Sequence, residues 1–324
     1  FNPNNVISHT NNFGCLKGAY MKKMTSIILL GILVATAFVV MNPVSASTHG
    51  VYAGKDALVN GNNLINVIHN AQTGDTVRVH AGTYQVTKTI TIPYDKIKIV
   101  GDDPFTTIID ASGNSGSCIT SQKNNTTIRN LTIRNSSGDA INLANDSEVS
   151  NCIIKDNKGH AIYGNLNIKV KYAYIENNGL DGIEINNNGA VENVISKGNN
   201  GNNIRVGSYS NVKNCLSTDS KSNDGIYAGS NSMIINCTSS NNYANGIKVG
   251  GHSTVINSIT TGNSLSGIDG PSTSSAKYCN SWENKKDYSG LARNEKCISK
   301  DPKFVSKNYT WKGWVENKDI DYAL

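Results

Sequence analysis

The feature that most constrains this chain is a residue pattern that returns at a nearly fixed step of 21 or 22 residues. Its clearest column consists of isoleucines: Ile119, Ile141, Ile162, Ile183, Ile204, Ile226, Ile247 and Ile268. A second column is mostly asparagine: Asn130, Asn151, Tyr172, Asn193, Asn214, Asn236, Asn257 and Tyr278. A third is aliphatic and lies two residues before the second: Ile128, Val149, Val170, Val191, Val212, Ile234, Val255 and Ala276. Three columns in one frame predict a solenoid of stacked coils.

The local pattern within one repeat indicates short strands rather than helices. Residues 181–185 alternate, so Ile183 and Ile185 face inward and Glu184 faces outward. A second strand follows at 191–194 and bends at Asn193, and turns rich in Asn and Gly separate the strands. This repeat is too long for hexapeptide left-handed helices and lacks the spacing of leucine-rich repeats. We therefore expect an all-β fold, a single-stranded right-handed parallel β-helix.

Composition agrees with a solenoid and argues against one class of partner. The 324 residues are only 38% hydrophobic, which suits coils that each bury only their own slice. The formal net charge is +6, but the lysines are scattered. Nucleic-acid binding would need a basic stripe with interleaved aromatic residues, and the sequence has none. No nucleic-acid partner is expected.

The first 46 residues read as upstream sequence followed by a targeting segment. Residues 1–20 have no periodicity and no initial Met, which indicates upstream, non-native translation. Residues 21–46 have a basic start, an apolar run from Ser26 to Val40 and the small residues Val44-Ser45-Ala46, the layout of a secretory signal peptide. The apolar run is short for a membrane span. We expect cleavage after Ala46, no stable membrane span afterwards, and a secreted or cell-surface protein.

Residues 50–117 differ in texture from the regular coils at 118–290. Leu64, Ile65, Ile68 and Ala71 share a helical face. A short amphipathic helix would cover the apolar cross-section of the first coil, which would otherwise be exposed. Irregular strands at 89–92, 97–100 and 107–109 would form imperfect first coils. Residues 291–324 would close the solenoid.

The cysteines give no metal motif. No CxxC pair occurs, so a zinc site is not expected. Cys152, Cys215, Cys237 and Cys279 occupy one column that is otherwise small or apolar, which predicts buried thiols. Cys279 and Cys297 could instead form a disulfide at the end of the solenoid if the protein is exported. That alternative stays open.

The asparagine column is interpreted as structural. Asparagine at a bend can satisfy backbone groups and stack on its neighbours as a hydrogen-bonded ladder. Tyr172 and Tyr278 interrupt the ladder and predict local bulges or an outward ring.

The outward face of the first strand holds the candidate site. The position after each isoleucine reads Asn142, Tyr163, Glu184, Arg205, Tyr227, Lys248 and Asp269, and three positions before it stand Asp139, His160, Asp181, Asn202, Asp224, Asn245 and Ser266. The positions between the two columns are small, at 140, 161, 182, 203, 225, 246 and 267, and predict a shallow trough. The predicted binding face consists of Asp139, His160, Tyr163, Asp181, Glu184, Arg205, Asp224, Tyr227, Lys248 and Asp269.

Two interpretations of this face stand side by side. It could bind a polysaccharide, because aromatic rings stack on sugars while Asp and Arg hydrogen-bond hydroxyls or carboxylates. It could instead be a surface ladder of charges that keeps the coils in register, with the pairs Glu184–Arg205 and Lys248–Asp269.

Two segments carry a family resemblance. The run NNLINVIHNAQTGDTVRVHAGTY (62–84) and the ending with DP-x-FV (301–305) and a final DYAL (321–324) resemble the cap and closing segment of the pectate-lyase-like right-handed β-helix superfamily, especially its NosD-like and surface-protein members. The resemblance covers residues 50–324. Members of this superfamily usually continue beyond that ending, so the sequence could be a fragment of a longer reading frame.

The resemblance implies specific chemistry. Lyases of this superfamily bind calcium through clustered acidic residues and abstract a proton α to a carboxylate with Arg or Lys. On this chain the calcium ligands would be Asp181, Glu184 and Asp224, and the base Arg205 or Lys248. Polygalacturonase-like relatives place an Asp pair and a Gly-His one coil apart, which Asp139 and His160 echo. Ala140 replaces the second Asp, so hydrolase activity is not expected.

Two functional hypotheses follow. The first is an exported, non-enzymatic, adhesin-like β-helix without a cofactor, whose strand face binds polysaccharide or cell-surface glycan. The second is a polysaccharide-active uronate lyase or epimerase that uses Asp181, Glu184, Arg205, Asp224 and Lys248, with calcium as its cofactor.

Overall fold

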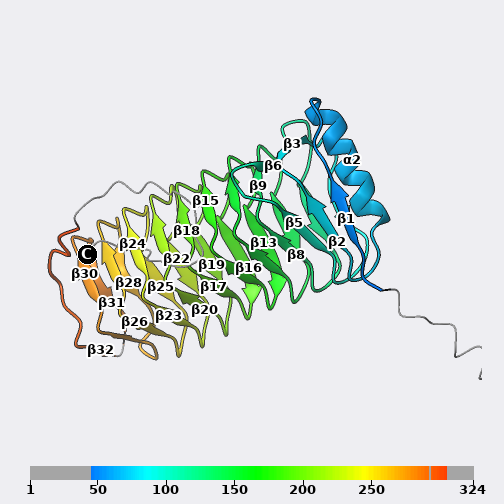
Figure 1. Ribbon diagram of the computed structural model, residues 1–324. Helices are drawn as coiled ribbons and strands as arrows, with labels where there is room; N and C mark the ends of the chain where they lie inside the picture. The colour runs from blue at the N-terminus through cyan, green and yellow to red at the C-terminus, as the bar shows by residue number, and fades with distance from the viewer. Residues whose placement is uncertain (1–44, 292, 305–324) are drawn as a thin grey trace, which may run out of the picture. The chain divides into compact units, whose positions relative to one another are not determined.

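The computed structural model describes residues 45–291 and 293–304. These residues coil into a right-handed parallel β-helix with three sheets along its axis (Figure 1), which confirms the predicted fold class. The predicted signal peptide and upstream segment lie almost wholly outside the described residues, as does the end of the closing segment. Within the described ranges no helix has the length and apolar character needed to span a bilayer.

Sheet A has twelve strands: β1 (Thr48–Val51), β2 (Thr76–Val79), β5 (Lys98–Gly101), β8 (Thr127–Arg129), β11 (Glu148–Ser150), β14 (Lys169–Lys171), β17 (Ala190–Glu192), β20 (Asn211–Lys213), β23 (Met233–Ile235), β26 (Thr254–Ile256), β29 (Ser275–Lys277) and β32 (Arg293–Glu295). Sheet B has ten: β3 (Gly82–Gln85), β6 (Thr107–Asp110), β9 (Thr132–Arg134), β12 (Ile153–Lys155), β15 (Tyr174–Glu176), β18 (Ile195–Lys197), β21 (Leu216–Thr218), β24 (Thr238–Ser240), β27 (Ile259–Thr261) and β30 (Asn280–Trp282). Sheet C also has ten: β4 (Ile90–Ile92), β7 (Ile119–Ser121), β10 (Ile141–Leu143), β13 (Ile162–Leu166), β16 (Ile183–Asn187), β19 (Ile204–Val206), β22 (Ile226–Ala228), β25 (Ile247–Val249), β28 (Ser266–Asp269) and β31 (Lys286–Ser289).

One helix covers the N-terminal end of the coils, as the sequence predicts. Helix α2 (Ala57–Asn70) is capped by Asp56, whose carboxylate accepts hydrogen bonds from the backbone N–H groups of Leu58 and Val59. Its buried face includes Leu64 and Ile68, and it packs on the strands of the first coil (Figure 1). The apolar cross-section of the solenoid is thus closed at this end.

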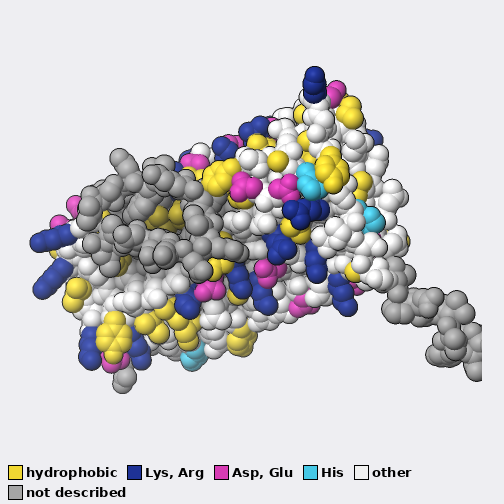
Figure 2. Space-filling view, viewed as in Figure 1, with side chains coloured by type: hydrophobic (Ala, Val, Ile, Leu, Met, Phe, Trp, Pro, Cys, Tyr) yellow, Lys and Arg dark blue, Asp and Glu magenta, His cyan; other side chains and the backbone are white. Residues whose placement is uncertain are grey.

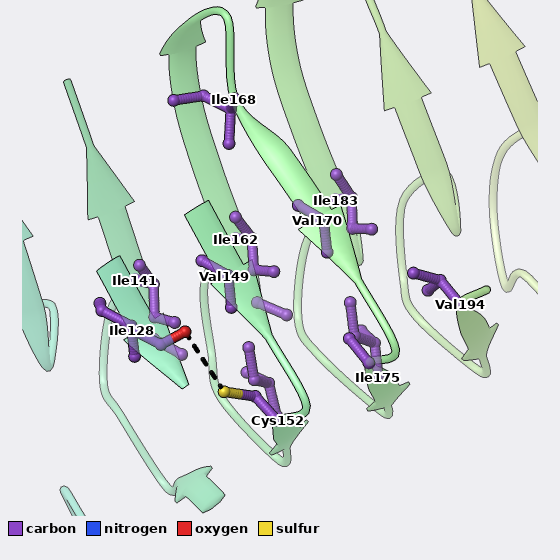
Figure 3. Packing of buried hydrophobic residues seen from close by; sticks show 14 of the residues in the cluster. Ile128, Ile141, Val149, Cys152, Ile162, Ile168, Val170, Ile175, Ile183 and Val194 are labelled. Atoms are coloured by element: carbon purple, nitrogen blue, oxygen red, sulfur yellow. Dashed lines mark hydrogen bonds between the residues drawn. The ribbon is translucent and has the colours of Figure 1, made fainter. Parts of the chain in front are cut away.

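The isoleucine column forms the spine of the core. Ile141, Ile162 and Ile183 pair directly across β10, β13 and β16, and each is fully buried. Figure 3 shows them stacked along the axis beside Val149 and Val170. The 21–22-residue step therefore exists because each coil must place its aliphatic side chains on those of the previous coil.

The cysteine column is buried, as predicted. The Sγ of Cys152 contacts the carbonyl of Ile128 in the preceding coil at 3.8 Å (Figure 3). Burial raises the pKa of Cys152 to about 12, so this thiol behaves as a small apolar group. Cys279 and Cys297 are free thiols in the structure, and the Cys279 N–H donates to the Cys297 Sγ at 3.4 Å. Their disulfide stays a prediction.

The asparagine ladder lies at the turns between sheets A and B. Its members have φ between 47° and 60°, the left-handed conformation that asparagine tolerates. Their side-chain amides bond from coil to coil, as from Asn214 Nδ2 to Asn193 Oδ1 at 3.2 Å. Tyr172 and Tyr278 adopt the same backbone conformation and are 44% and 50% exposed, which matches the predicted outward ring.

This ladder makes a stability prediction. Asn214 has φ of 53°, donates to Asn193 and accepts from Asn236. Asn214→Ala is expected to lower the free energy of unfolding by about 2–3 kcal/mol, from left-handed strain plus lost hydrogen bonds, and Asn214→Gly by about 1 kcal/mol, because glycine carries no strain. Urea unfolding of both variants measures this. Equal losses would refute the conformational role.

A second asparagine ladder, which sequence reasoning missed, runs through the interior. Asn157 donates to Asn178, Asn178 to Asn199, and Asn242 to Asn263, each at 2.9 Å. All five are at least 98% buried. A buried amide of this kind must be satisfied by its neighbours, so each coil depends on the next.

Candidate functional site

The outward column of sheet C forms a continuous row, as predicted. In register from β10 to β28 it reads Asn142, Tyr163, Glu184, Arg205, Tyr227, Lys248 and Asp269. Strands in a sheet are about 4.8 Å apart, so neighbouring side chains of this row can touch.

The small residues beside this row do not form the expected trough. Ala140 and Ala161 are fully buried. A Cβ on Gly182 would lie 2.4 Å from Ser196 Oγ and 2.7 Å from Asn199 Nδ2, both interior groups. The trough prediction is wrong because these residues face inward, and they are small to make room for the interior polar ladder.

The column at the edge of sheet C is mainly a backbone-bonding ladder. A side-chain oxygen of one coil accepts the backbone N–H of the same position in the next coil. Five such bonds occur: Asp139 to His160 (2.9 Å), Asp181 to Asn202 (2.6 Å), Asn202 to Asp224 (3.2 Å), Asp224 to Asn245 (2.9 Å) and Asn245 to Ser266 (3.0 Å). The structural role of these carboxylates is to hold the backbone of the next coil, and it is shared by Asp139, Asp181 and Asp224.

His160 breaks this ladder. It stands in a column whose other members from Asp139 to Asn245 are Asp or Asn acceptors, and its Nδ1 is buried without a hydrogen-bond partner in the described part of the chain. Its Nε2 lies 3.4 Å from Glu184 Oε2, and its ring is tilted against that of Tyr163 at 5.7 Å between centroids. A buried polar atom left unsatisfied costs stability, so this nitrogen does not support coil stacking as the Asp and Asn oxygens of the column do.

Glu184 and Arg205 complete a cluster around this imidazole. Arg205 Nη1 is 2.5 Å from Glu184 Oε1, so this predicted ion pair is confirmed. The arginine side chain is 46% exposed, and its guanidinium lies 5.8 Å from the centroid of the Tyr227 ring. Ligand-capable atoms of His160, Asp181 and Glu184 all lie within 4.8 Å of one another. We call His160, Asp181, Glu184 and Arg205 the His160 cluster.

The other predicted site residues lie outside the cluster. Asp224 Oδ1 accepts both N–H groups of Asn245, at 2.9 and 2.8 Å. Lys248 and Asp269 are neighbours in register, but they form no ion pair among the described residues, so the second predicted pair is absent there. The sequence signal that could have singled out the cluster is the single imidazole in an Asp/Asn column.

Burial of Asp181 gives a prediction for pH. Burial raises the pKa of this carboxyl, hydrogen bonds from the Asn202 backbone oppose the rise, and the Glu184 charge adds to it. The folded state therefore holds this proton more tightly than the unfolded chain, and the free energy of unfolding falls as pH rises from the unfolded to the folded pKa. Asp181→Asn keeps the oxygen acceptor and removes the titration. The free energy of unfolding, measured across mildly acidic pH, should fall less steeply with rising pH in Asp181→Asn than in the wild-type chain. Identical slopes in the two proteins would show that Asp181 does not have the raised pKa.

The cluster does not fit the calcium implied by the resemblance. Calcium takes six to eight oxygen ligands. Here one of three donors is an imidazole, Glu184 is paired with Arg205, and Asp181 Oδ1 accepts two N–H groups of Asn202. Asp224, the third predicted ligand, is not in the group. We expect the thermal unfolding midpoint to be the same in calcium and in chelator, and a rise with calcium would contradict this.

Comparisons with known proteins bear on the family and the fold. The family model described as rhamnogalacturonase A/epimerase, pectate lyase-like, matches residues 46–269. The A-module of the Azotobacter vinelandii mannuronan C-5 epimerase AlgE4 is similar in structure, with TM-score 0.59 and 15% identity over 76% of this chain and 94% of that one. The catalytic domain of a GH87 alpha-1,3-glucanase (TM-score 0.54, 16% identity, 81% and 57%) and the pectate lyase Pel9A (0.52, 13%, 80% and 80%) are also similar. At these identities the likeness shows the fold alone. No curated protein matches.

Proposed function

Because the chain belongs to the pectate-lyase-like rhamnogalacturonase A/epimerase family, we propose that it is an enzyme acting on a uronate polysaccharide at the His160 cluster, as a lyase or a C-5 epimerase. The observation that carries the proposal is the unpaired, buried Nδ1 of His160 in a column where every other described Asp or Asn from Asp139 to Asn245 supports the backbone. Among the structural neighbours are a mannuronan C-5 epimerase and a pectate lyase, whose names denote work on polyuronates.

Each member of the cluster has a role in this proposal. Arg205 faces solvent with a planar guanidinium that matches a carboxylate, so it would hold the uronate carboxylate. His160 would remove the proton on the adjacent carbon through Nε2, the ring nitrogen that faces Glu184, since histidine is the commonest general base. Glu184 lies between them and would orient both. Asp181 would position the cluster through the backbone of the next coil.

The proposed step balances without a further reactant. The C5–H bond breaks, its proton passes to His160, and its electron pair moves into the carboxylate held by Arg205. In elimination the C4–O bond then breaks, a C4–C5 double bond forms, and the leaving oxygen takes the proton from His160. In epimerisation water delivers a proton to C5 from the opposite face, and His160 releases the proton that it took to the solvent, so no net reactant is consumed.

The sequence-based assignment of the base is revised in this proposal. Arg205 is paired with Glu184 and lies over the Tyr227 ring, an arrangement that suits binding of a carboxylate rather than proton removal. Lys248 lies two coils from Arg205 and contributes no ligand atom to the cluster. Neither is needed as a base when an imidazole is present.

The test is incubation of the full chain with polygalacturonate, alginate and a neutral glucan. Ultraviolet absorbance of an unsaturated uronate, or altered uronate stereochemistry by NMR, is the expected result with the acidic polymers only. New reducing ends without unsaturation would indicate a hydrolase and refute the proposal.

A non-catalytic glycan-binding face on an exported protein is the second candidate. It is favoured by the hydrogen bonds along the edge of sheet C, because most polar side chains there support the backbone of the next coil. Binding of acidic polysaccharide with no chemical change, in the same incubations, would select it.

A further inference from the structure

A second site lies away from the His160 cluster, on sheet A. A groove of about 370 Å³ opens there, lined by Gly74, Lys96, Lys98, Asn125, Thr127, Asp146, Ser147, Glu148 and Lys169. Figure 2 shows Lys and Arg side chains gathered on this face, over the N-terminal strands of sheet A. Neither the catalytic proposal nor the repeat pattern accounts for it.

Strand register makes the groove a straight track across the coils. Lys98, Thr127, Glu148 and Lys169 are consecutive partners on β5, β8, β11 and β14. At about 4.8 Å per strand, Lys98 and Lys169 are about 14 Å apart along the track. Arg129 and Lys171 stand two residues further along their strands and so point to the same side.

The cations along this groove make no close ion pair with the described part of the protein. Among the described residues Lys96, Lys98, Arg129, Lys169 and Lys171 form no ion pair within 4.0 Å. Further along the same sheet, Lys213 pairs with Glu192 (3.8 Å) and Lys277 with Glu295 (3.6 Å). The carboxylates in the groove are fewer: Glu148, and Asp146, which accepts from Asn167. The track therefore has unpaired positive charge at a defined spacing.

The lining also narrows the class of anion. It contains no aromatic and no large apolar side chain, so it offers no platform for stacked bases and nothing to insert into a membrane. It combines lysines with amide and hydroxyl groups (Asn125, Thr127, Ser147) and with carboxylates that can accept from sugar hydroxyls. Hydroxyls and carboxylates alternate in this way along an acidic polysaccharide.

We propose that this groove, which we call the sheet A track, is an accessory binding site for a strand of uronate polysaccharide, separate from the His160 cluster. The substrate class rests on the proposed function, whereas the existence of a polyanion site does not. Binding here would hold a long polymer to the solenoid while another part of it occupies sheet C.

The test compares two double variants that remove the same charge. Lys98→Ala with Lys169→Ala removes unpaired cations of the track. Lys213→Ala with Lys277→Ala, the control, removes cations that already have carboxylate partners on the same sheet. Polygalacturonate affinity, measured by affinity electrophoresis at several salt concentrations, is expected to fall about tenfold or more in the track variant and much less in the control. Turnover of short uronate oligomers at saturation should be unchanged in both.

Three outcomes would overturn the proposal: equal weakening in both double variants, equal binding of a neutral glucan, or binding of duplex DNA as tight as that of polygalacturonate. The two proposals fail separately. Track-dependent binding without any turnover would remove the enzymatic proposal and leave the sheet A track standing. Turnover together with an unchanged polygalacturonate affinity in the track variant would remove the sheet A track and leave the enzymatic proposal standing.

Discussion

Replacing His160 with asparagine is expected to abolish turnover without weakening the fold. Loss of a general base costs about 100- to 10,000-fold in rate. Asparagine is the residue that occupies the same column at Asn202 and Asn245, where its oxygen accepts the N–H of the next coil. His160→Asn should therefore complete the ladder, remove an unsatisfied buried nitrogen and leave the thermal midpoint equal or higher.

The matched control for this variant is Asn245→Ala. Asn245 accepts from Ser266 and donates to Asp224, at 3.0 and 2.8 Å. Its loss should lower the free energy of unfolding by about 1–3 kcal/mol and leave turnover unchanged. A His160→Asn protein that is both active and less stable would show that the imidazole serves coil stacking.

The second large effect is expected at Arg205. Arg205→Ala should lower kcat/KM for polyuronate by about 100- to 1,000-fold, because the charge that develops on the substrate carboxylate loses its partner. Arg205→Lys should recover only part of this, since an ammonium cannot make the bidentate contact. Stability should change little, because this partly exposed ion pair contributes little to folding.

The control for Arg205 is Lys248→Ala on the same row of sheet C. It removes one positive charge at a position outside the cluster. We expect a small change in kcat/KM from this variant. Equal losses in Arg205→Ala and Lys248→Ala would indicate that the face acts through its overall charge rather than through a carboxylate clamp.

The fold could be predicted from the sequence because a solenoid is stable only when equivalent side chains of successive coils lie in register. A column such as Ile141, Ile162 and Ile183 repeats only because each side chain must pack on its counterpart in the next coil. The same logic correctly placed helix α2 over the first coil and the cysteine column in the core.

The candidate site could be predicted only in part from the same spacing. Sequence spacing gives the direction of a side chain but not its hydrogen bonds. The aspartates of the edge column looked like binding residues, yet Asp139 and Asp224 accept hydrogen bonds from the backbone of the next coil. The glycines looked like a trough, yet Gly182 faces an interior polar ladder that was itself overlooked. Only in three dimensions does His160 stand out as the member of its column with a buried, unpaired nitrogen.

The central claim is that this chain removes the C5 proton of a uronate through His160. The most direct measurement is proton NMR of polygalacturonate and alginate incubated with the protein in deuterated water. Elimination destroys the C5–H bond and epimerisation replaces its proton with deuterium, so either reaction makes the H5 signal disappear. We expect loss of this signal with the wild-type chain and its full retention with His160→Asn. An H5 signal that persists across the acidic polymers with the folded wild-type chain, or that disappears equally with His160→Asn, would contradict it.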